Sequence, residues 1–162
     1  MNSAQSKGTA LVTGASSGIG AVYAERLAGR DHDLLLVARD EHKLHSAATR
    51  LRAEYGVQVE VLKADLTLKA DMLAVEQRLR TDRRISVLVN NAGVAADGTL
   101  ASADLEQMER LIQLNVVAVT RLAAAAAASF SNAGTGAIIN VASVVALIPE
   151  QFNATYSASK AY

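Results

Sequence analysis

Residues 9–20 read Thr9-Ala10-Leu11-Val12-Thr13-Gly14-Ala15-Ser16-Ser17-Gly18-Ile19-Gly20, and this stretch decides the fold. Its apolar first half predicts a short buried strand at residues 9–12, and the residues after Gly20 predict a helix that runs to about Gly29. Glycines between a strand and a helix let backbone N–H groups approach a pyrophosphate, and the helix adds the partial positive charge of its amino end. The stretch therefore predicts a phosphate-binding loop with the spacing G-x-x-x-G-x-G.

Outside this stretch, apolar runs and helical patterns alternate along the chain. Further strands are predicted at residues 33–38, 57–62, 85–89 and 136–142, with helices between them. This alternation predicts an α/β fold, a single domain with a doubly wound parallel sheet of the Rossmann type. The carboxyl ends of parallel strands meet at one edge of such a sheet. Because the glycine loop, Asn90 and Ser143 all follow predicted strands, we expect a site at that edge.

Two other motifs compete for the glycine loop. Residues 14–18 also match the G-x-S-x-G nucleophile elbow of hydrolases, which needs a histidine later in the chain. No histidine occurs after His45, so the sequence disfavours a serine hydrolase. A P-loop is excluded because no Gly-Lys-Ser/Thr closes the motif. From this loop alone, glycines that serve only a tight turn stay open as an alternative.

Tyr156 and Lys160 lie four residues apart, with Ser143 thirteen residues upstream of the tyrosine. On a helix, this spacing puts the phenol and the ammonium on one face. A free phenol has a pKa near 10, so an acid/base group useful at neutral pH needs a downward shift of about three units, or about 4 kcal/mol. Lys160 and a bound cationic cofactor would supply it. Taken alone, however, such a pair also fits an exposed helix face.

The glycine loop, Asn90-Asn91-Ala92-Gly93, Asn115, Ser143 and Tyr156-x-x-x-Lys160 occur in this order. In these motifs the chain resembles the short-chain dehydrogenase/reductase family, in its classical subgroup, over essentially its whole length. The resemblance implies that Tyr156 donates or accepts a proton, and that Ser143 holds the substrate oxygen. Lys160 would lower the pKa of Tyr156 and bond the nicotinamide ribose. Asn115 would bind a water that links Lys160 to a proton relay.

The resemblance also implies a cofactor-binding set. The glycine loop would line the pyrophosphate, Asp65 would contact the adenine, and Gly93 would lie against the cofactor, while Asn90 would stabilise the central strand. The full set is Gly14, Ser16, Ser17, Gly18, Ile19, Gly20, Arg39, Asp65, Leu66, Asn91, Ala92, Gly93, Tyr156 and Lys160. No metal site is expected.

The end of the second predicted strand bears on cofactor choice. Arg39 lies nineteen residues past Gly20. An acidic residue at about this distance would pair with the ribose 2′-hydroxyl of NAD, whereas an arginine suits a 2′-phosphate. NADP(H) is therefore favoured over NAD(H). The neighbouring Asp40 is the competing signal, and we favour a different role for it, as the cap of the next helix.

Composition limits the other functions. The 162 residues carry a formal net charge of zero and no cysteine, which gives no reason to expect nucleic acid, disulfides or thiolate metal sites. The amino end is polar, and the apolar region at residues 137–148 is too short to span a bilayer. We expect a cytoplasmic protein with no membrane partner that acts on a small-molecule carbonyl or alcohol substrate as a homodimer or homotetramer. The alanine run at residues 123–128 is interpreted as core packing rather than an oligomer seam.

The chain stops two residues after Lys160, within the helix predicted to carry the catalytic pair. Members of the family continue through that helix and at least one more strand. We therefore expect residues 1–162 to form a dinucleotide-binding domain that lacks its C-terminal strands and helices, with a bare sheet edge at residues 136–142. The predicted function is an NADP(H)-dependent oxidoreductase that interconverts a ketone or aldehyde and an alcohol. A non-catalytic nucleotide-binding module or an inactive fragment is the alternative.

Overall fold

The computed structural model describes residues 6–96, 100–148 and 154–162. Its strands form one parallel sheet in the order β3-β2-β1-β4-β5, so the predicted doubly wound sheet is confirmed. The strands are β1 (Thr9–Thr13), β2 (Asp33–Ala38), β3 (Val59–Lys63), β4 (Ile85–Asn90) and β5 (Ala137–Asn140).

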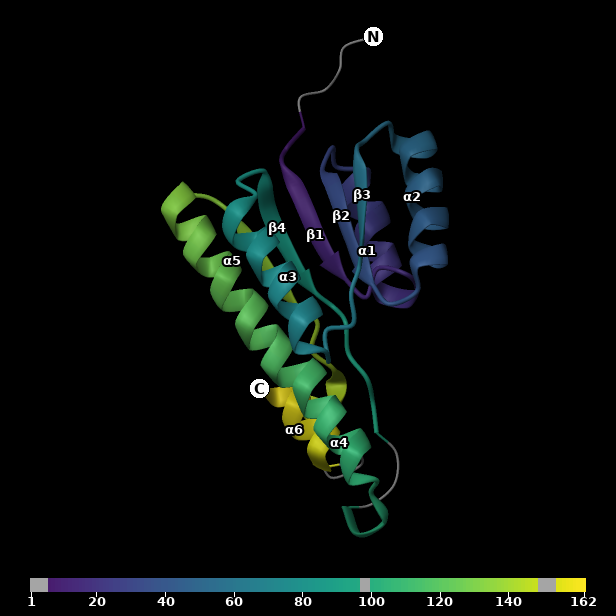
Figure 1. The fold of residues 1–162 in the computed structure, drawn as a ribbon, viewed down its shortest axis with the longest axis vertical. Coiled ribbons are helices and arrows are strands. Elements are labelled where there is room, and N and C mark those ends of the chain that lie inside the picture. The colour runs from purple at the N-terminus through teal and green to yellow at the C-terminus, as the bar shows by residue number, and fades with distance from the viewer. Residues whose placement is uncertain (1–5, 97–99, 149–153) are drawn as a thin grey trace.

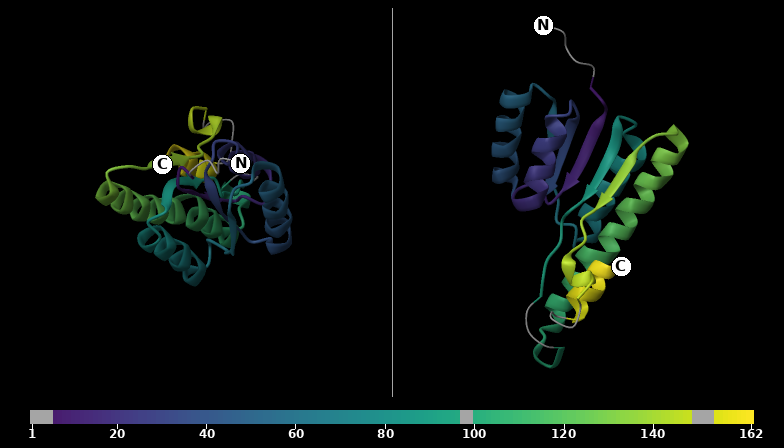
Figure 2. Two further views of the ribbon diagram at one scale, coloured as in Figure 1. Left: turned by 90° about the horizontal axis from the view of Figure 1, so that it is seen from above. Right: turned by 180° about the vertical axis from the view of Figure 1, so that it is seen from behind.

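Helices cover both faces of the sheet (Figures 1 and 2). One face carries α1 (Gly18–Ala28) and α2 (Glu41–Tyr55), and the other carries α3 (Lys69–Thr81) and α5 (Val119–Ala133). Two shorter helices, α4 (Leu105–Ile112) and α6 (Ala154–Ala161), lie beyond the carboxyl ends of the strands (Figure 1). Short 3-10 turns occupy Leu100–Ser102 and Val144–Ala146.

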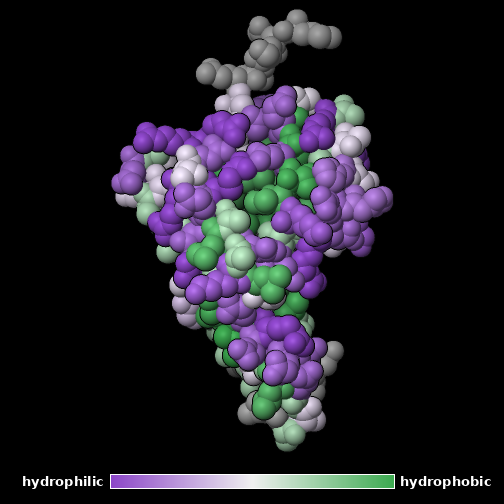
Figure 3. Space-filling view, viewed as in Figure 1, coloured by the Kyte–Doolittle hydropathy of each residue, from purple (hydrophilic) through white to green (hydrophobic). Residues whose placement is uncertain are grey.

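Two hydrophobic cores arise because successive strand residues point to opposite faces. In β2, Leu34 and Leu36 pack toward α1 and α2, whereas Leu35 and Val37 pack toward α3 and α5. All four side chains are buried, which explains why the strand reads as a continuous apolar run. In the view of Figure 3, hydrophobic side chains show over the strands between α2 and α3, and hydrophilic ones cover much of the outer helix surface.

The long helical region that begins with α4 is not a regular α-helix throughout. A π-helical segment, Gln113–Ala118, separates α4 from α5. In α5, Ala125 and Ala126 are buried against the sheet, as expected for core packing, whereas Ala127 and Ala128 are exposed. Among the described residues, the continuous run Leu105–Ala133 has the length and hydropathy of a membrane-crossing helix. Its buried apolar residues from Ala118 onward belong to the core between α3 and the sheet, whereas Met108 and Leu111 belong to a small cluster with Ala96.

The last strand is shorter than predicted. It ends at Asn140 rather than residue 142, although the Val141 N–H still donates to the Asn90 carbonyl at 2.9 Å. In the described residues β5 pairs with β4 alone, and Ile138 is 36% exposed. The predicted apolar sheet edge is therefore present. The third strand lies one to two residues later than predicted, since the Gln58 N–H bonds to the Asp33 carboxylate at 2.8 Å.

Candidate active site

The glycine loop closes tightly over the end of β1. Gly14 and Gly18 have φ angles of +66° and +55°, a region that glycine enters readily and other residues rarely. A Cβ atom on Gly14 would stand 2.7 Å from the side-chain nitrogen of Asn91, and one on Gly20 would overlap the Gly14 carbonyl. Within the described residues, no atom lies within 4 Å of a Cβ built on Gly18. The loop is thus closed toward β4 and open over Gly18, as a phosphate cradle requires.

Thr13 and Asn91 join the ends of β1 and β4. The Thr13 hydroxyl donates to the Val89 carbonyl (3.2 Å) and accepts from the N–H groups of Asn91 and Ala92 (both 3.0 Å). The Asn91 side-chain amide donates to the carbonyls of Thr13 (3.0 Å) and Gly14 (3.3 Å). Thr13 was not among the predicted site residues. A polar residue that ends an apolar strand just before a glycine is the signal that points to it.

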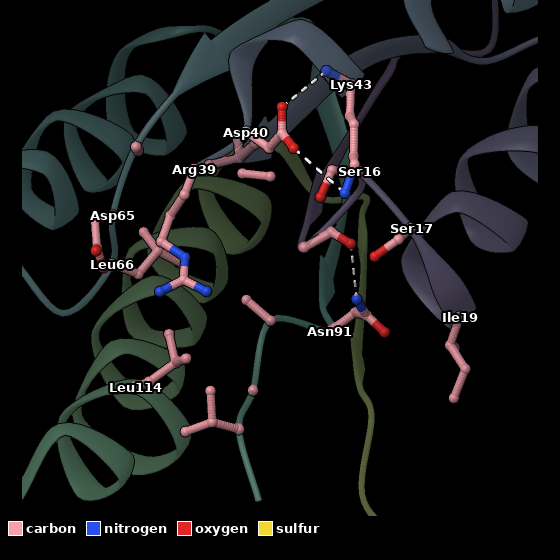
Figure 4. A pocket seen from close by; sticks show the side chains of 17 residues that line it. Ser16, Ser17, Ile19, Arg39, Asp40, Lys43, Asp65, Leu66, Asn91 and Leu114 are labelled. Carbon is pink, nitrogen blue, oxygen red and sulfur yellow. Dashed lines mark hydrogen bonds and ion pairs between the residues drawn. The ribbon is translucent and has the colours of Figure 1, made fainter. Parts of the chain in front are cut away.

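A cleft of about 700 Å³ lies across the carboxyl ends of β1, β2, β3 and β4 and includes the point between β1 and β4 where the strand order reverses (Figure 4). Open α/β sheets bind ligands at this switch point. This switch-point cleft is lined by Gly14, Ser16, Ser17, Ile19, Val37, Ala38, Arg39, Asp40, Lys43, Ala64, Asp65, Leu66, Asn91, Ala92, Gly93, Val94 and Leu114. Most residues predicted to bind the cofactor belong to it, whereas Gly18, Gly20, Tyr156 and Lys160 do not.

Arg39 and Lys43 bring positive charge to the cleft. Arg39 directly follows β2, and its guanidinium projects into the cleft (Figure 4). Asp40 caps α2, as predicted: one carboxylate oxygen accepts from the Lys43 N–H at 3.0 Å, and the other lies 3.4 Å from Lys43 Nζ. The hydrogen bond from the Lys43 backbone holds the pKa of Asp40 below its ordinary value of 3.8. Lys43 was not predicted, although its position in the first turn of the helix that Asp40 was expected to cap was the available signal.

Asp65 and Leu66 lie after β3 in the wall of the same cleft. The Asp65 carboxylate accepts hydrogen bonds from the N–H (3.0 Å) and the hydroxyl (2.7 Å) of Thr67, and the Asp65 N–H donates to the carboxylate of Asp71 (2.8 Å). Leu66 is 5% exposed. These bonds fix the turn that leads into α3 and hold Asp65 at the cleft.

The side chains of Lys160 and Asn115 lie against Gly93, which is one of the residues that line the switch-point cleft. A Cβ atom on Gly93 would lie 3.1 Å from Asn115 Oδ1 and 3.3 Å from Lys160 Nζ, so the bare glycine makes room for both side chains. The Lys160 ammonium donates to the Val141 carbonyl at 3.0 Å, and burial lowers the pKa of Lys160 below its ordinary value of 10.5. Asn115 and Lys160 also line a second cleft of about 440 Å³, between β5, α5 and α6.

Ser143 and Tyr156 come from two elements that pack against each other, the turn Val144–Ala146 and α6. Ser143 caps the turn, since its hydroxyl accepts from the Val145 N–H at 3.4 Å. Tyr156 is half-buried and packs against buried residues of α4, one helical turn before Lys160. Neither Ser143 nor Tyr156 lines either of the two clefts.

Nearly the whole chain matches a known protein family: the family model described as short chain dehydrogenase matches residues 8–162. An uncharacterized oxidoreductase from Staphylococcus saprophyticus is 36% identical over 153 residues, which are 94% of this chain and 65% of that protein.

Two solved structures are similar over nearly the whole chain. The bulky-bulky ketone specific alcohol dehydrogenase from Comamonas testosteroni has a TM-score of 0.94 and 48% identity, covering 97% of this chain and 63% of that one. A short-chain dehydrogenase from Sphingobium yanoikuyae, solved in complex with NADPH, has a TM-score of 0.93 and 58% identity, covering 95% and 60%. The chain therefore spans less than two thirds of each of these three proteins.

Proposed function

Since the chain belongs to the short-chain dehydrogenase family, we propose that the protein is an NADP(H)-dependent oxidoreductase that interconverts a ketone or aldehyde and an alcohol. The observation that carries this proposal is the switch-point cleft, which runs from the glycine loop past Arg39 to Gly93, with Lys160 behind that glycine. NADP(H) would supply the hydride donor or acceptor when bound. The chain spans less than two thirds of the length of these relatives, so the activity and the substrate of the whole protein are part of what we propose.

The amino end of α1 fits a dinucleotide phosphate. Ser17, the residue before the helix, makes no side-chain capping bond, so the first N–H groups of α1 are not satisfied by that side chain. Such groups, together with the positive end of the helix, bind anions. The open space over Gly18 would admit the phosphate where a side chain would obstruct it. The residues we assign to the pyrophosphate are Gly14, Ser16, Ser17, Gly18, Ile19 and Gly20.

We assign the preference for NADP(H) to the charge around Arg39. Its guanidinium would meet a 2′-phosphate with the planar, bidentate geometry that suits phosphate oxygens. Lys43 adds a second cation in the same cleft. The Asp40 carboxylate accepts a hydrogen bond from the Lys43 N–H and forms an ion pair with the Lys43 ammonium. These contacts support a role for Asp40 as a helix cap rather than as a partner of a ribose hydroxyl. The NADPH complex of the Sphingobium yanoikuyae relative agrees with this assignment.

The catalytic roles follow the family pattern. Tyr156 would transfer the proton to or from the substrate oxygen, and Ser143 would stabilise that oxygen with a hydrogen bond. The Lys160 ammonium lies one turn from Tyr156 on α6 and would favour the phenolate by its positive charge. Asn115, held beside Lys160 at Gly93, would support the proton relay. Asp65 and Leu66 would contact the adenine, and Asn91, Ala92 and Gly93 would lie along the cofactor.

Turnover with a panel of carbonyl compounds tests the proposal. The panel should contain aldehydes, small ketones and ketones with two large substituents, because one relative is a bulky-bulky ketone specific alcohol dehydrogenase. We expect oxidation of NADPH with at least one of them, and slower oxidation of NADH. NADPH binding without turnover of any compound would favour the alternative, a non-catalytic nucleotide-binding module. A homodimer or homotetramer and a cytoplasmic location stay predictions, to be tested by light scattering and cell fractionation.

A further inference from the structure

Helix α6 carries two buried serines whose hydroxyl groups differ in their hydrogen bonding. Ser157 is 1% exposed and Ser159 is 8% exposed. The Ser157 hydroxyl has no hydrogen-bond partner within the described part of the chain. The Ser159 hydroxyl donates to the Tyr156 carbonyl at 2.7 Å and accepts from the Asn115 side-chain amide at 3.0 Å. Because both serines are buried, burial alone does not explain the two hydrogen bonds of the Ser159 hydroxyl.

The bond to Ser159 completes the hydrogen bonding of Asn115. An asparagine side chain offers one carbonyl oxygen and two N–H donors. Asn115 Oδ1 accepts from the Val94 N–H at 3.0 Å, and Nδ2 donates to the Val94 carbonyl at 2.8 Å and to Ser159 Oγ at 3.0 Å. The side chain is 4% exposed, so a lost partner could not readily be replaced by bulk water. Asn115 thus connects the loop after β4 to α6.

Other side chains also tie α6 to the rest of the protein. At its carboxyl end, Lys160 Nζ bonds to the Val141 carbonyl at 3.0 Å, and the Tyr162 hydroxyl bonds to Thr120 Oγ1 at 3.0 Å. The Ser159 side chain links α6 directly to Asn115, and through Asn115 to the residue that follows Gly93.

We propose that Ser159 is a positioning residue, whose hydroxyl holds α6 against Asn115 and so sets where Tyr156 and Lys160 stand relative to the cleft. This inference rests on the proposed function. Ser159 itself does not line the switch-point cleft. It acts through its two neighbours: Asn115, which meets Lys160 at Gly93, and the backbone of Tyr156. Misplacement of a catalytic group by about 1 Å can cost two orders of magnitude in rate, so a loosened α6 should lower turnover.

The matched pair Ser159→Ala and Ser157→Ala tests the proposal, since both changes remove a buried hydroxyl from the same helix. In the natural full-length protein, we expect Ser159→Ala to lower kcat about tenfold. The Kd for NADPH should change much less, by no more than about threefold, because the cleft that holds most of the predicted cofactor contacts is lined by no residue of α6. Ser157→Ala should keep the wild-type kcat, because it breaks no hydrogen bond. If Ser159→Ala does not fold, Ser159→Cys replaces it, because a thiol of similar shape bonds only weakly.

A folded Ser159 variant with wild-type kcat would overturn the proposal, as would an equal loss of kcat in the Ser157 variant. A parallel loss of kcat and NADPH affinity would also overturn it, because Ser159 would then support the whole site. Exchange of the Asn115 side-chain amide protons, followed by NMR, separates this test from that of the proposed function. If the wild-type protein reduces no carbonyl compound, the proposed function fails. Faster exchange in Ser159→Ala than in Ser157→Ala still supports the link, and equal exchange removes it.

Discussion

Gly20, in the first turn of α1, lies so close to Gly14 that a Cβ atom on Gly20 would overlap the Gly14 carbonyl. The same Cβ would overlap the side-chain amide of Asn91, which bonds to that carbonyl. The helix can approach the loop because residue 20 has no side chain. This contact fixes the amino end of α1 at the edge of the switch-point cleft.

Gly20→Ala should therefore disturb the cleft. We expect a loss of about 1–3 kcal/mol in the free energy of unfolding from overpacking, and at least about a tenfold weaker affinity for NADPH, because the amino end of α1 must shift. Denaturant unfolding and calorimetric titration measure the two effects. The control is Gly56→Ala at the end of α2, where φ is +71° and, in the described structure, no atom lies within 4 Å of the Cβ position. Gly56→Ala should cost stability only, and unchanged NADPH binding by Gly20→Ala would contradict the account.

The fold was predictable because its signals are local. The strand predicted at residues 9–12 and its glycine loop follow from neighbouring residues, and Asp40 could be recognised as a cap from its place before a helical pattern. The roles of Thr13 and Ser159 were not predictable, because each depends on a partner that lies more than 40 residues away in the sequence. The π-helical segment was missed because apolar residues at helical spacing run through it.

We expect the hydrogen bonds of the Thr13 hydroxyl to stabilise the folded protein. Thr13→Val keeps the shape of the side chain but leaves the N–H groups of Asn91 and Ala92 without this acceptor. We expect the free energy of unfolding to fall by about 1–3 kcal/mol, because two part-buried donors lose their acceptor. Thr9→Val is the control. Thr9 lies in the same strand, and its hydroxyl makes no hydrogen bond within the described residues. Similar unfolding midpoints for the two variants would argue against the lock between β1 and β4.

Arg39 should decide between the two nicotinamide cofactors. Arg39→Ala removes the proposed partner of the 2′-phosphate, so NADPH affinity should fall by about tenfold to a hundredfold while NADH affinity changes little. Binding of each cofactor to each variant gives the ratio directly. Arg26→Ala removes an arginine from the last turn of α1, outside the cleft, and should leave both affinities unchanged. An equal effect of Arg39→Ala on NADPH and NADH would refute the 2′-phosphate assignment.

We expect the titration of Asp82 to make the stability of the folded protein depend on pH in the acid range. Hydrogen bonds from Arg84, and then from Arg78, lower the pKa of Asp82 from 3.8 to about 2. A carboxyl group with a depressed pKa in the folded state adds stability above its unfolded pKa, and the gain is lost as pH falls through the folded pKa. Asp82→Asn should therefore destabilise the protein near pH 6, and the difference from wild type should shrink between about pH 4 and pH 2.

Unfolding midpoints measured across this range test the Asp82 prediction. Asp31→Asn is a suitable control, because the ion pair of Asp31 with Lys7 is more than half exposed and contributes little to stability. A difference between wild type and Asp82→Asn that stays constant from pH 6 to pH 2 would show that the Asp82 carboxylate does not supply the stability.

The most direct measurement is the turnover and NADPH affinity of Tyr156→Phe, with the natural full-length protein and its best carbonyl substrate. The change removes one hydroxyl, so we expect kcat to fall by about a hundredfold or more while the Kd for NADPH stays at the wild-type value. Tyr55→Phe, on α2 and outside both clefts, should behave as wild type. Wild-type turnover by Tyr156→Phe would show that this phenol does not transfer the proton.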